Sequence, residues 1–137
     1  MENTGKSALG LEGNIAALIG YIIWPVALVS VIIEKENKFV RFHAIQSLLY
    51  HAAIIVAIIL LVIIVIFLGI IGIASAAAGS SAGGAIGGIF GSLISLVWMI
   101  FILAYLAGLI YAAVQAYGNK WFKLPIVGNM AEKFSNK

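Results

Sequence analysis

The stretch Ala52–Ala74 reads AAIIVAIILLVIIVIFLGIIGIA and holds no side chain more polar than glycine. As an α-helix it would be about 34 Å long, slightly more than the roughly 30 Å of a bilayer's hydrocarbon core. Lipid offers no water to backbone N–H and C=O groups, so an isolated segment that crosses it must satisfy them within a helix. This stretch therefore predicts a transmembrane helix.

Two further apolar segments flank it, Ile15–Ile33 and Leu93–Val114. Each approaches the roughly 20 residues that span a bilayer. Trp24-Pro25 lies within the first, where the proline removes a backbone donor and predicts a kink. We predict an all-α integral membrane protein that forms a single membrane domain over residues 1–137. Its three transmembrane helices, at about 15–33, 44–74 and 86–117, would form a compact bundle, and the tail at 118–137 would hold a short interfacial amphipathic helix.

The composition supports a membrane protein and excludes other classes. Hydrophobic residues make up 64% of the chain and charged residues 9%, against roughly 45–50% and 25% in soluble domains. A soluble fold of this size cannot bury so much apolar surface, and a disordered chain would be more polar. The chain has no cysteine, no aspartate and no glutamate within a predicted span. It also lacks phosphate-binding and nucleophile motifs, so we expect no enzyme, no cofactor and no metal.

The positions of the positive charges predict a topology. With three spans, Lys6 would lie on one side and every other basic residue on the other. The positive-inside rule then places the N-terminus outside and the C-terminus in the cytoplasm, in a multi-pass protein of the cell membrane. The formal charge of +3 is then a topological signal rather than a sign of nucleic-acid binding. The basic residues are Lys6, Lys35, Lys38, Arg41, Lys120, Lys123, Lys133 and Lys137.

Two alternatives bear on the number of spans. The first segment could be a signal peptide, but it is longer than the usual apolar region and ends at Glu34-Lys35-Glu36 instead of a small-residue cleavage site. A fourth span could lie in Ser75–Ser92, but it would divide the positive charge between the two sides.

Small residues recur at steps of four in two places. In helices such steps line one face and let two membrane helices approach closely. We therefore predict helix packing, within the bundle or between protomers, at both. The first run is a helical extension or a flexible outer loop, because glycine disfavours helix. The two runs are Gly79, Gly83, Gly87 and Gly91, and Ala104, Gly108, Ala112 and Ala116.

Polar residues gather before the long apolar stretch. If a helix starts near Phe39, five of them share an arc of about 140° and Arg41 lies on the other side. They could form hydrogen bonds with headgroups and neighbouring helices, or a recognition vestibule for a segment, lipid or ion. A metal site is disfavoured because the two histidines are two turns apart. The candidate residues are Arg41, His43, Gln46, Ser47, Tyr50 and His51.

The tail carries aromatic and basic residues together. Lys120, Trp121 and Lys123 are typical of an anchor at a membrane interface. After Pro125, apolar residues recur from Val127 to Phe134 at helical spacing. This region is either an amphipathic helix on the cytoplasmic face or a frayed tail.

The sequence FVRFHAIQS, at Phe39–Ser47, is a motif distinctive enough to identify a protein family. With the entry Leu11–Asn14 and the glycine-rich link, it resembles a widespread family of small prokaryotic membrane proteins of unknown function. That family is similar to the membrane subunit of the chloroplast inner-envelope protein-import translocon. The resemblance implies a helical membrane protein with a charged cytoplasmic loop and suggests a role in translocation or channel formation.

Two functions follow from these observations. The first is a structural or interaction subunit of a membrane complex that oligomerises through its small-residue faces. The alternative is a channel or translocon-like conduit formed by an oligomer. The expected partners are the lipid bilayer and either further copies of the chain or other membrane protein subunits.

Overall fold

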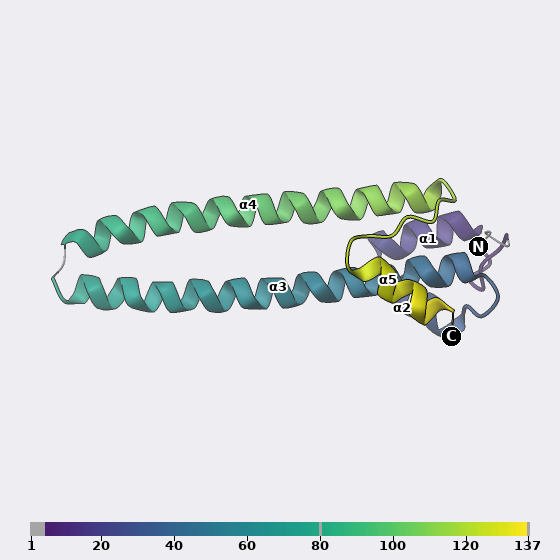
Figure 1. Cartoon of the computed structure of the whole chain (residues 1–137), viewed down its shortest axis with the longest axis horizontal. Coiled ribbons are helices and arrows are strands. Elements are labelled where there is room, and N and C mark those ends of the chain that lie inside the picture. The colour runs from purple at the N-terminus through teal and green to yellow at the C-terminus, as the bar shows by residue number, and fades with distance from the viewer. Residues whose placement is uncertain (1–4, 80, 137) are drawn as a thin grey trace. The chain divides into compact units, whose positions relative to one another are not determined.

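The computed structural model describes residues 5–79 and 81–136, and it places five helices in chain order (Figure 1). They fall into two compact units, the first built from two separate parts of the chain and the second from one continuous segment. The first unit comprises Met1–Ala53 and Leu106–Lys137, and the second comprises Ile54–Tyr105. The helices are α1 (Gly13–Ile22), α2 (Trp24–Ile33), α3 (Lys38–Ala77), α4 (Ser81–Tyr117) and α5 (Val127–Ser135).

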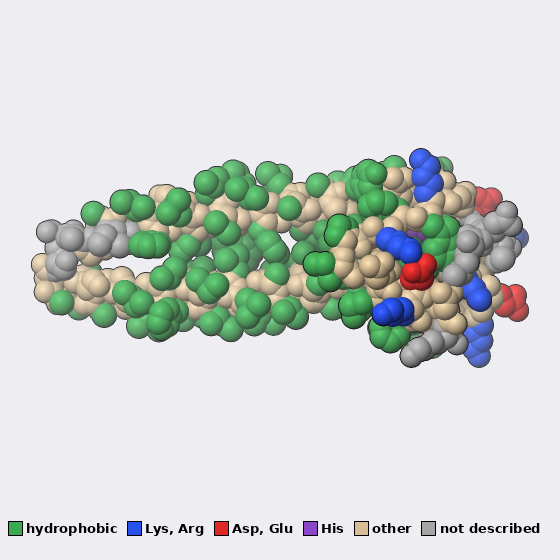
Figure 2. Space-filling view, in the orientation of Figure 1, with side chains coloured by type: hydrophobic (Ala, Val, Ile, Leu, Met, Phe, Trp, Pro, Cys, Tyr) green, Lys and Arg blue, Asp and Glu red, His purple; other side chains and the backbone are tan. Residues whose placement is uncertain are grey.

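The second unit is a hairpin of two apolar helix segments, taken from α3 and α4. It contains no charged residue, and large apolar side chains cover its surface (Figure 2). Both α3 and α4 are long and apolar enough to cross a membrane. The hairpin turn follows Ala77, where Gly79 adopts φ +76°, a conformation that glycine reaches without strain. The chain is helical again from Ser81, so the helical interpretation of the first small-residue run is confirmed from there on.

The first apolar segment differs from its prediction. It forms two helices of 10 residues, α1 and α2, and not one span. Ile23 interrupts the helix with φ −120° and ψ 87°, and Pro25 lies in the first turn of α2. The predicted kink at Pro25 is thus a complete break. A proline inside a helix removes one backbone hydrogen bond, whereas in the first turn of a new helix the missing N–H costs nothing.

The two short helices fold back against each other. An ideal Cβ on Gly20 would lie 3.6 Å from the Cβ of Ala27, whereas seven residues of straight helix advance about 10.5 Å. Just before α1 and just after α2, the Ala8 N–H donates to Glu34 Oε2 at 2.7 Å. Residues before α1 and after α2 therefore lie side by side, and the segment returns to the end where it began. Of the three predicted transmembrane helices, two correspond to described helices that are long and apolar enough to cross a membrane.

The first unit has a core built from most of its segments. Small residues of α1 and α4 pack against aromatic and aliphatic residues of α3 and of the segment after α4. The segment 118–126 leads to α5, so the C-terminal region is a helix and not a frayed tail. The buried core residues are Ala16, Ala17, Tyr21, Phe39, Val40, Ala112, Ala113, Ala116, Leu124 and Val127.

Candidate functional site

The sequence motif FVRFHAIQS forms the first turns of α3, and most of it is buried in the first unit. His43, Gln46 and Ser47 are fully buried, as are the aromatic rings of Phe39 and Phe42. Asn37 lies just before the helix, and its Oδ1 accepts from the Val40 N–H at 3.3 Å, as an N-cap side chain does. The motif therefore holds its polar residues inside a packed core.

His43 connects α1 to the segment after α4. Its Nδ1 lies 3.1 Å from the Tyr21 hydroxyl, and its Nε2 lies 3.2 Å from the Lys120 carbonyl oxygen. A carbonyl oxygen only accepts, so Nε2 must carry the proton of this hydrogen bond. Nδ1 of the neutral ring then accepts from the Tyr21 hydroxyl. A neutral His43 with its proton on Nε2 satisfies every partner.

Gln46 completes the network with three hydrogen bonds. Its Nε2 donates to the Tyr21 hydroxyl oxygen at 2.7 Å and to the Phe122 carbonyl at 3.0 Å. Its Oε1 accepts from the Leu124 N–H at 3.1 Å. The amide orientation follows from these partners, because only its nitrogen can donate to a carbonyl and only its oxygen can accept from an N–H. Gln46 thus ties the segment after α4 to α1 and α3.

The remaining polar residues of the predicted stripe continue along α3. Ser47 Oγ donates to the Gly20 carbonyl at 2.8 Å, which fixes α3 against the end of α1. His51 Nδ1 lies 2.8 Å from the Ser47 carbonyl of its own helix. Tyr50 packs against Gly108 of α4, where an ideal Cβ would overlap the tyrosine hydroxyl. His43, Gln46, Ser47 and Tyr50 therefore contact neighbouring segments of the first unit.

Arg41 is the exception in the motif. It lies on the other side of α3, as predicted, and its Nε is buried without a hydrogen-bond partner among the described residues. It borders a cavity of about 410 Å³ together with apolar residues of α2, α3 and α5.

The three predicted anchor residues have different surroundings. The Trp121 ring packs against Phe42, with 4.5 Å between ring centroids, and is half-buried. Lys120 is exposed and supplies its backbone carbonyl to His43. Lys123 is exposed and forms an ion pair of 2.8 Å with Glu132 of α5. Of these three residues, only the two lysines are therefore exposed.

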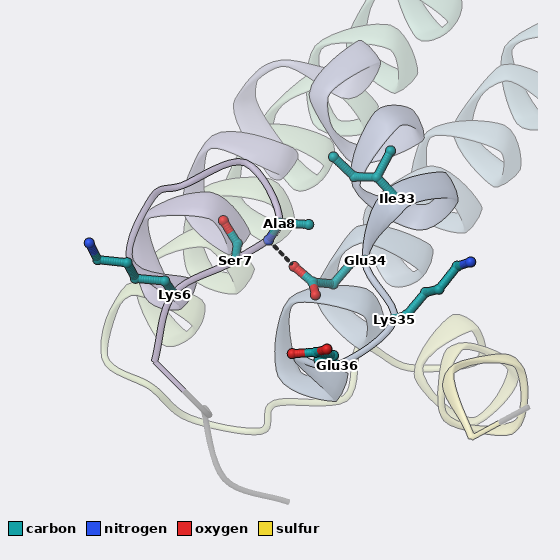
Figure 3. A pocket seen from close by; sticks show the side chains of 7 residues that line it. All are labelled: Lys6, Ser7, Ala8, Ile33, Glu34, Lys35 and Glu36. Carbon is teal, nitrogen blue, oxygen red and sulfur yellow. Dashed lines mark hydrogen bonds between the residues drawn. The ribbon is translucent and has the colours of Figure 1, made fainter.

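One buried charged residue was not singled out from the sequence. Glu34 is buried, and its two carboxylate oxygens accept from the N–H groups of Ala8 and Asn37, at 2.7 and 3.1 Å. It borders a cavity of about 590 Å³ between the N-terminal segment and the loop after α2 (Figure 3). Lys35 and Glu36, which follow it, are exposed. Nothing in the sequence distinguishes the buried Glu34 from the exposed Glu36.

The small-residue runs divide into packed and open positions. Gly83 contacts Ser75 across the hairpin of the second unit, and Gly108 contacts Tyr50. Ala112 is buried in the core of the first unit, and Ala104 is exposed. Gly87 and Gly91 border a groove of about 450 Å³ between α3 and α4 in the second unit. Close packing within the chain therefore uses part of each run.

Comparison with known proteins gives the family. The model of the magnetosome magnetite crystal formation protein family matches residues 7–131, which include α1 to α4 and the motif of α3. The chain belongs to this family. No solved structure matches it.

Two relatives of this chain are described as membrane proteins. A UPF0132 membrane protein of Archaeoglobus fulgidus is 30% identical over 124 residues, which cover 90% of this chain and 95% of the relative. A UPF0132 membrane protein of Methanocaldococcus jannaschii is 29% identical over 141 residues, which cover 96% of both chains. The predicted membership in a family of small prokaryotic membrane proteins is confirmed. The resemblance to the chloroplast translocon subunit stays a prediction.

Proposed function

We propose that this protein is a structural or interaction subunit of a membrane complex, without enzymatic activity, and that it assembles through an open helix face. The observation that carries the proposal is the surface of the second unit. It has no charge, and its large apolar side chains point outward from both helices. Such a surface is stable only against lipid or another apolar surface.

The fold of the first unit supports a topology with two spans. α1 and α2 have 10 residues each, or about 15 Å, which is half of the hydrocarbon core. They would enter the bilayer as a re-entrant hairpin. Its tip is apolar and exposed, with Ile22 at 64% and Trp24 at 53%. All basic residues then lie on one side, which satisfies the positive-inside rule better than three spans do. This arrangement moves the N-terminus to the cytoplasmic side, beside the C-terminus.

Cysteine labelling tests the topology, because the chain has no native cysteine. Single cysteines at Ala8, Glu36, Ala78 and Asn129 are exposed to a membrane-impermeant maleimide in intact cells and in inverted vesicles. We expect Ala78→Cys to react only from outside and the other three only from the cytoplasmic side. The three-span topology predicts instead that Ala8→Cys and Ala78→Cys react from the same side. The unsubstituted chain is the control for background labelling.

The open helix face supports self-assembly. Ideal Cβ atoms on Gly84 and Gly88 of α4 would meet no atom within 4 Å, and Ser92 is exposed one turn further on. Steps of four small residues are the pattern by which membrane helices approach closely. The face therefore offers a contact for a second copy that the chain itself does not occupy.

Substitution of Gly88 by leucine tests this contact. We expect Gly88→Leu to reduce the oligomer in mild detergent, measured by light scattering with chromatography. Ala107→Leu, which adds comparable bulk at another exposed position of α4, is the matched control and should leave the oligomer intact. An oligomer of unchanged size and stability in Gly88→Leu would contradict assembly through this face.

The alternative, a channel or translocon-like conduit, needs polar groups that line a pore in an oligomer. His43, Gln46 and Ser47 are instead engaged by partners within the first unit. The structural role therefore has the stronger support. Flux through liposomes that contain the inserted protein, above that of protein-free liposomes, would favour the conduit.

A further inference from the structure

Arg41 carries a buried hydrogen-bond donor that nothing in the described chain accepts. Its Nε is shielded from solvent and has no partner among residues 5–79 and 81–136. The ion pair found in this part of the chain joins Lys123 to Glu132 and does not involve Arg41. Buried donors in folded proteins are almost always paired, and an unpaired one on a charged group is costly. Arg41 is partly exposed as a whole, so its guanidinium can be reached by an anionic acceptor from outside the chain that would pair this Nε.

The cavity beside Arg41 is otherwise apolar. It has a volume of about 410 Å³ and is bordered by residues of α2, α3 and α5 that all belong to the first unit. Ile45, Leu48 and Leu49 follow Arg41 on α3 by four, seven and eight residues, so they extend the same helix face away from the guanidinium. The complete lining is Val31, Arg41, Ile45, Leu48, Leu49 and Phe134. A free phosphate would find a partner for its charge here but would leave this apolar surface uncovered.

The direction of α3 gives the cavity a polar and an apolar end. Lys38 lies one turn before Arg41, while the helix after His51 has no polar side chain until Ser75. Glu36, the acid nearest to Arg41 in sequence, is exposed, and Glu34 is already engaged by the N–H groups of Ala8 and Asn37. A phospholipid has the same polarity, with a phosphate at one end and acyl chains that extend into the membrane. Guanidinium groups bind phosphate through paired, charge-assisted hydrogen bonds.

We propose that Arg41 and the apolar groove between α2, α3 and α5 bind one anionic phospholipid, with its phosphate at the guanidinium and an acyl chain along Ile45 and Leu48. The proposal rests on the membrane location of the protein. The lipid would fill the space between the re-entrant hairpin and α5 and would pair the buried donor of Arg41.

Native mass spectrometry of the full chain tests the site. The protein is purified in a mild non-ionic detergent and titrated with dioleoylphosphatidylglycerol, with zwitterionic dioleoylphosphatidylcholine, and with inorganic phosphate. We expect one phosphatidylglycerol per chain, retained with about tenfold or greater preference over phosphatidylcholine, because the two lipids share the phosphate but only choline would place a positive charge beside the guanidinium. Equal retention of the two lipids would overturn the proposal. Displacement of phosphatidylglycerol by inorganic phosphate would show a free-anion site instead.

Two variants separate the site from general charge attraction. Arg41→Gln should abolish the preference for phosphatidylglycerol, while Lys38→Gln, which removes the same charge one turn away, should keep it. Equal losses in both variants would contradict a specific site. Circular dichroism confirms that each variant is folded. Arg41→Lys keeps the charge without the planar fork and should retain lipid to an intermediate degree.

Carbonate extraction tests the membrane location separately from the lipid site. If the protein leaves the membrane fraction on carbonate extraction, the proposed membrane role fails. If the protein stays in that fraction but shows no lipid preference in detergent, only the lipid site fails.

Discussion

Replacement of Gln46 by leucine tests whether the polar network holds the first unit together. Leucine has a similar volume but removes all three hydrogen bonds of the amide. Tyr21 keeps its contact with His43. The Phe122 carbonyl and the Leu124 N–H lose the bonds that they make to Gln46. An unsatisfied buried group costs about 1–3 kcal/mol, so we expect Gln46→Leu to lower the free energy of unfolding by about 2–6 kcal/mol.

The assay is reversible unfolding in mixed micelles of dodecyl maltoside and increasing sodium dodecyl sulfate. Near-UV circular dichroism reports on tertiary packing, including that of Trp121 in the first unit. Gln115→Leu is the matched control, because Gln115 makes a hydrogen bond of 2.8 Å to Tyr111 at an exposed position of α4. Its effect should stay within about 0.5 kcal/mol. A difference between the two variants below about 1 kcal/mol would refute the claim that Gln46 is a structural centre.

Three further substitutions probe close contacts in the first unit. Gly128→Ala should destabilise the docking of α5, because a Cβ there would lie 2.6 Å from the Cβ of Lys123, and faster limited proteolysis after Pro125 is the measurement. Glu34→Gln should lower the thermal unfolding midpoint, since the amide keeps only one acceptor oxygen for two N–H groups; an unchanged midpoint would contradict the role of this carboxylate. Gly108→Leu should lower the thermal midpoint of the monomer, because the added side chain would displace Tyr50, and loss of the oligomer with an unchanged midpoint would show that Gly108 acts between copies.

Long, uniform hydropathy made the two long helices predictable. Ala52–Ala74 and Leu93–Val114 lie within α3 and α4, and a helix satisfies its backbone hydrogen bonds within one segment. The predicted start near Phe39 is close to the observed start at Lys38. Apolar composition was sufficient to predict these two helices, because each is so long that its prediction does not depend on the cap or turn at either end.

The hairpin of α1 and α2 was not predictable from hydropathy. Ile15–Ile33 is as apolar as a span and nearly as long, and hydropathy does not record where a helix reverses. The deciding contact is local and steric, between Gly20 and Ala27 on either side of the break. Small residues at these two positions beside Pro25 are a signal that could have suggested the reversal.

The sequence predicted the side chains of the polar network but not their partners. Helical spacing put His43, Gln46 and Ser47 on one face, and all three form hydrogen bonds from that face. Four of their partners are backbone groups, of Gly20, Lys120, Phe122 and Leu124. Every residue has such groups, so the sequence does not mark which of them will be used.

The hydrogen bonds of Gln46 also impose an order on biosynthesis. Its partners Phe122 and Leu124 follow it by 76 and 78 residues, so a ribosome that adds about 5–20 residues per second makes them several seconds later. During that interval the amide can bond to Tyr21, but the groups that bind Phe122 and Leu124 must stay hydrated or find other partners. The apolar hairpin between these residues can insert into the bilayer meanwhile. Closure of the first unit is therefore the last step of folding, and a chain truncated after α4 should be a substrate for membrane quality control.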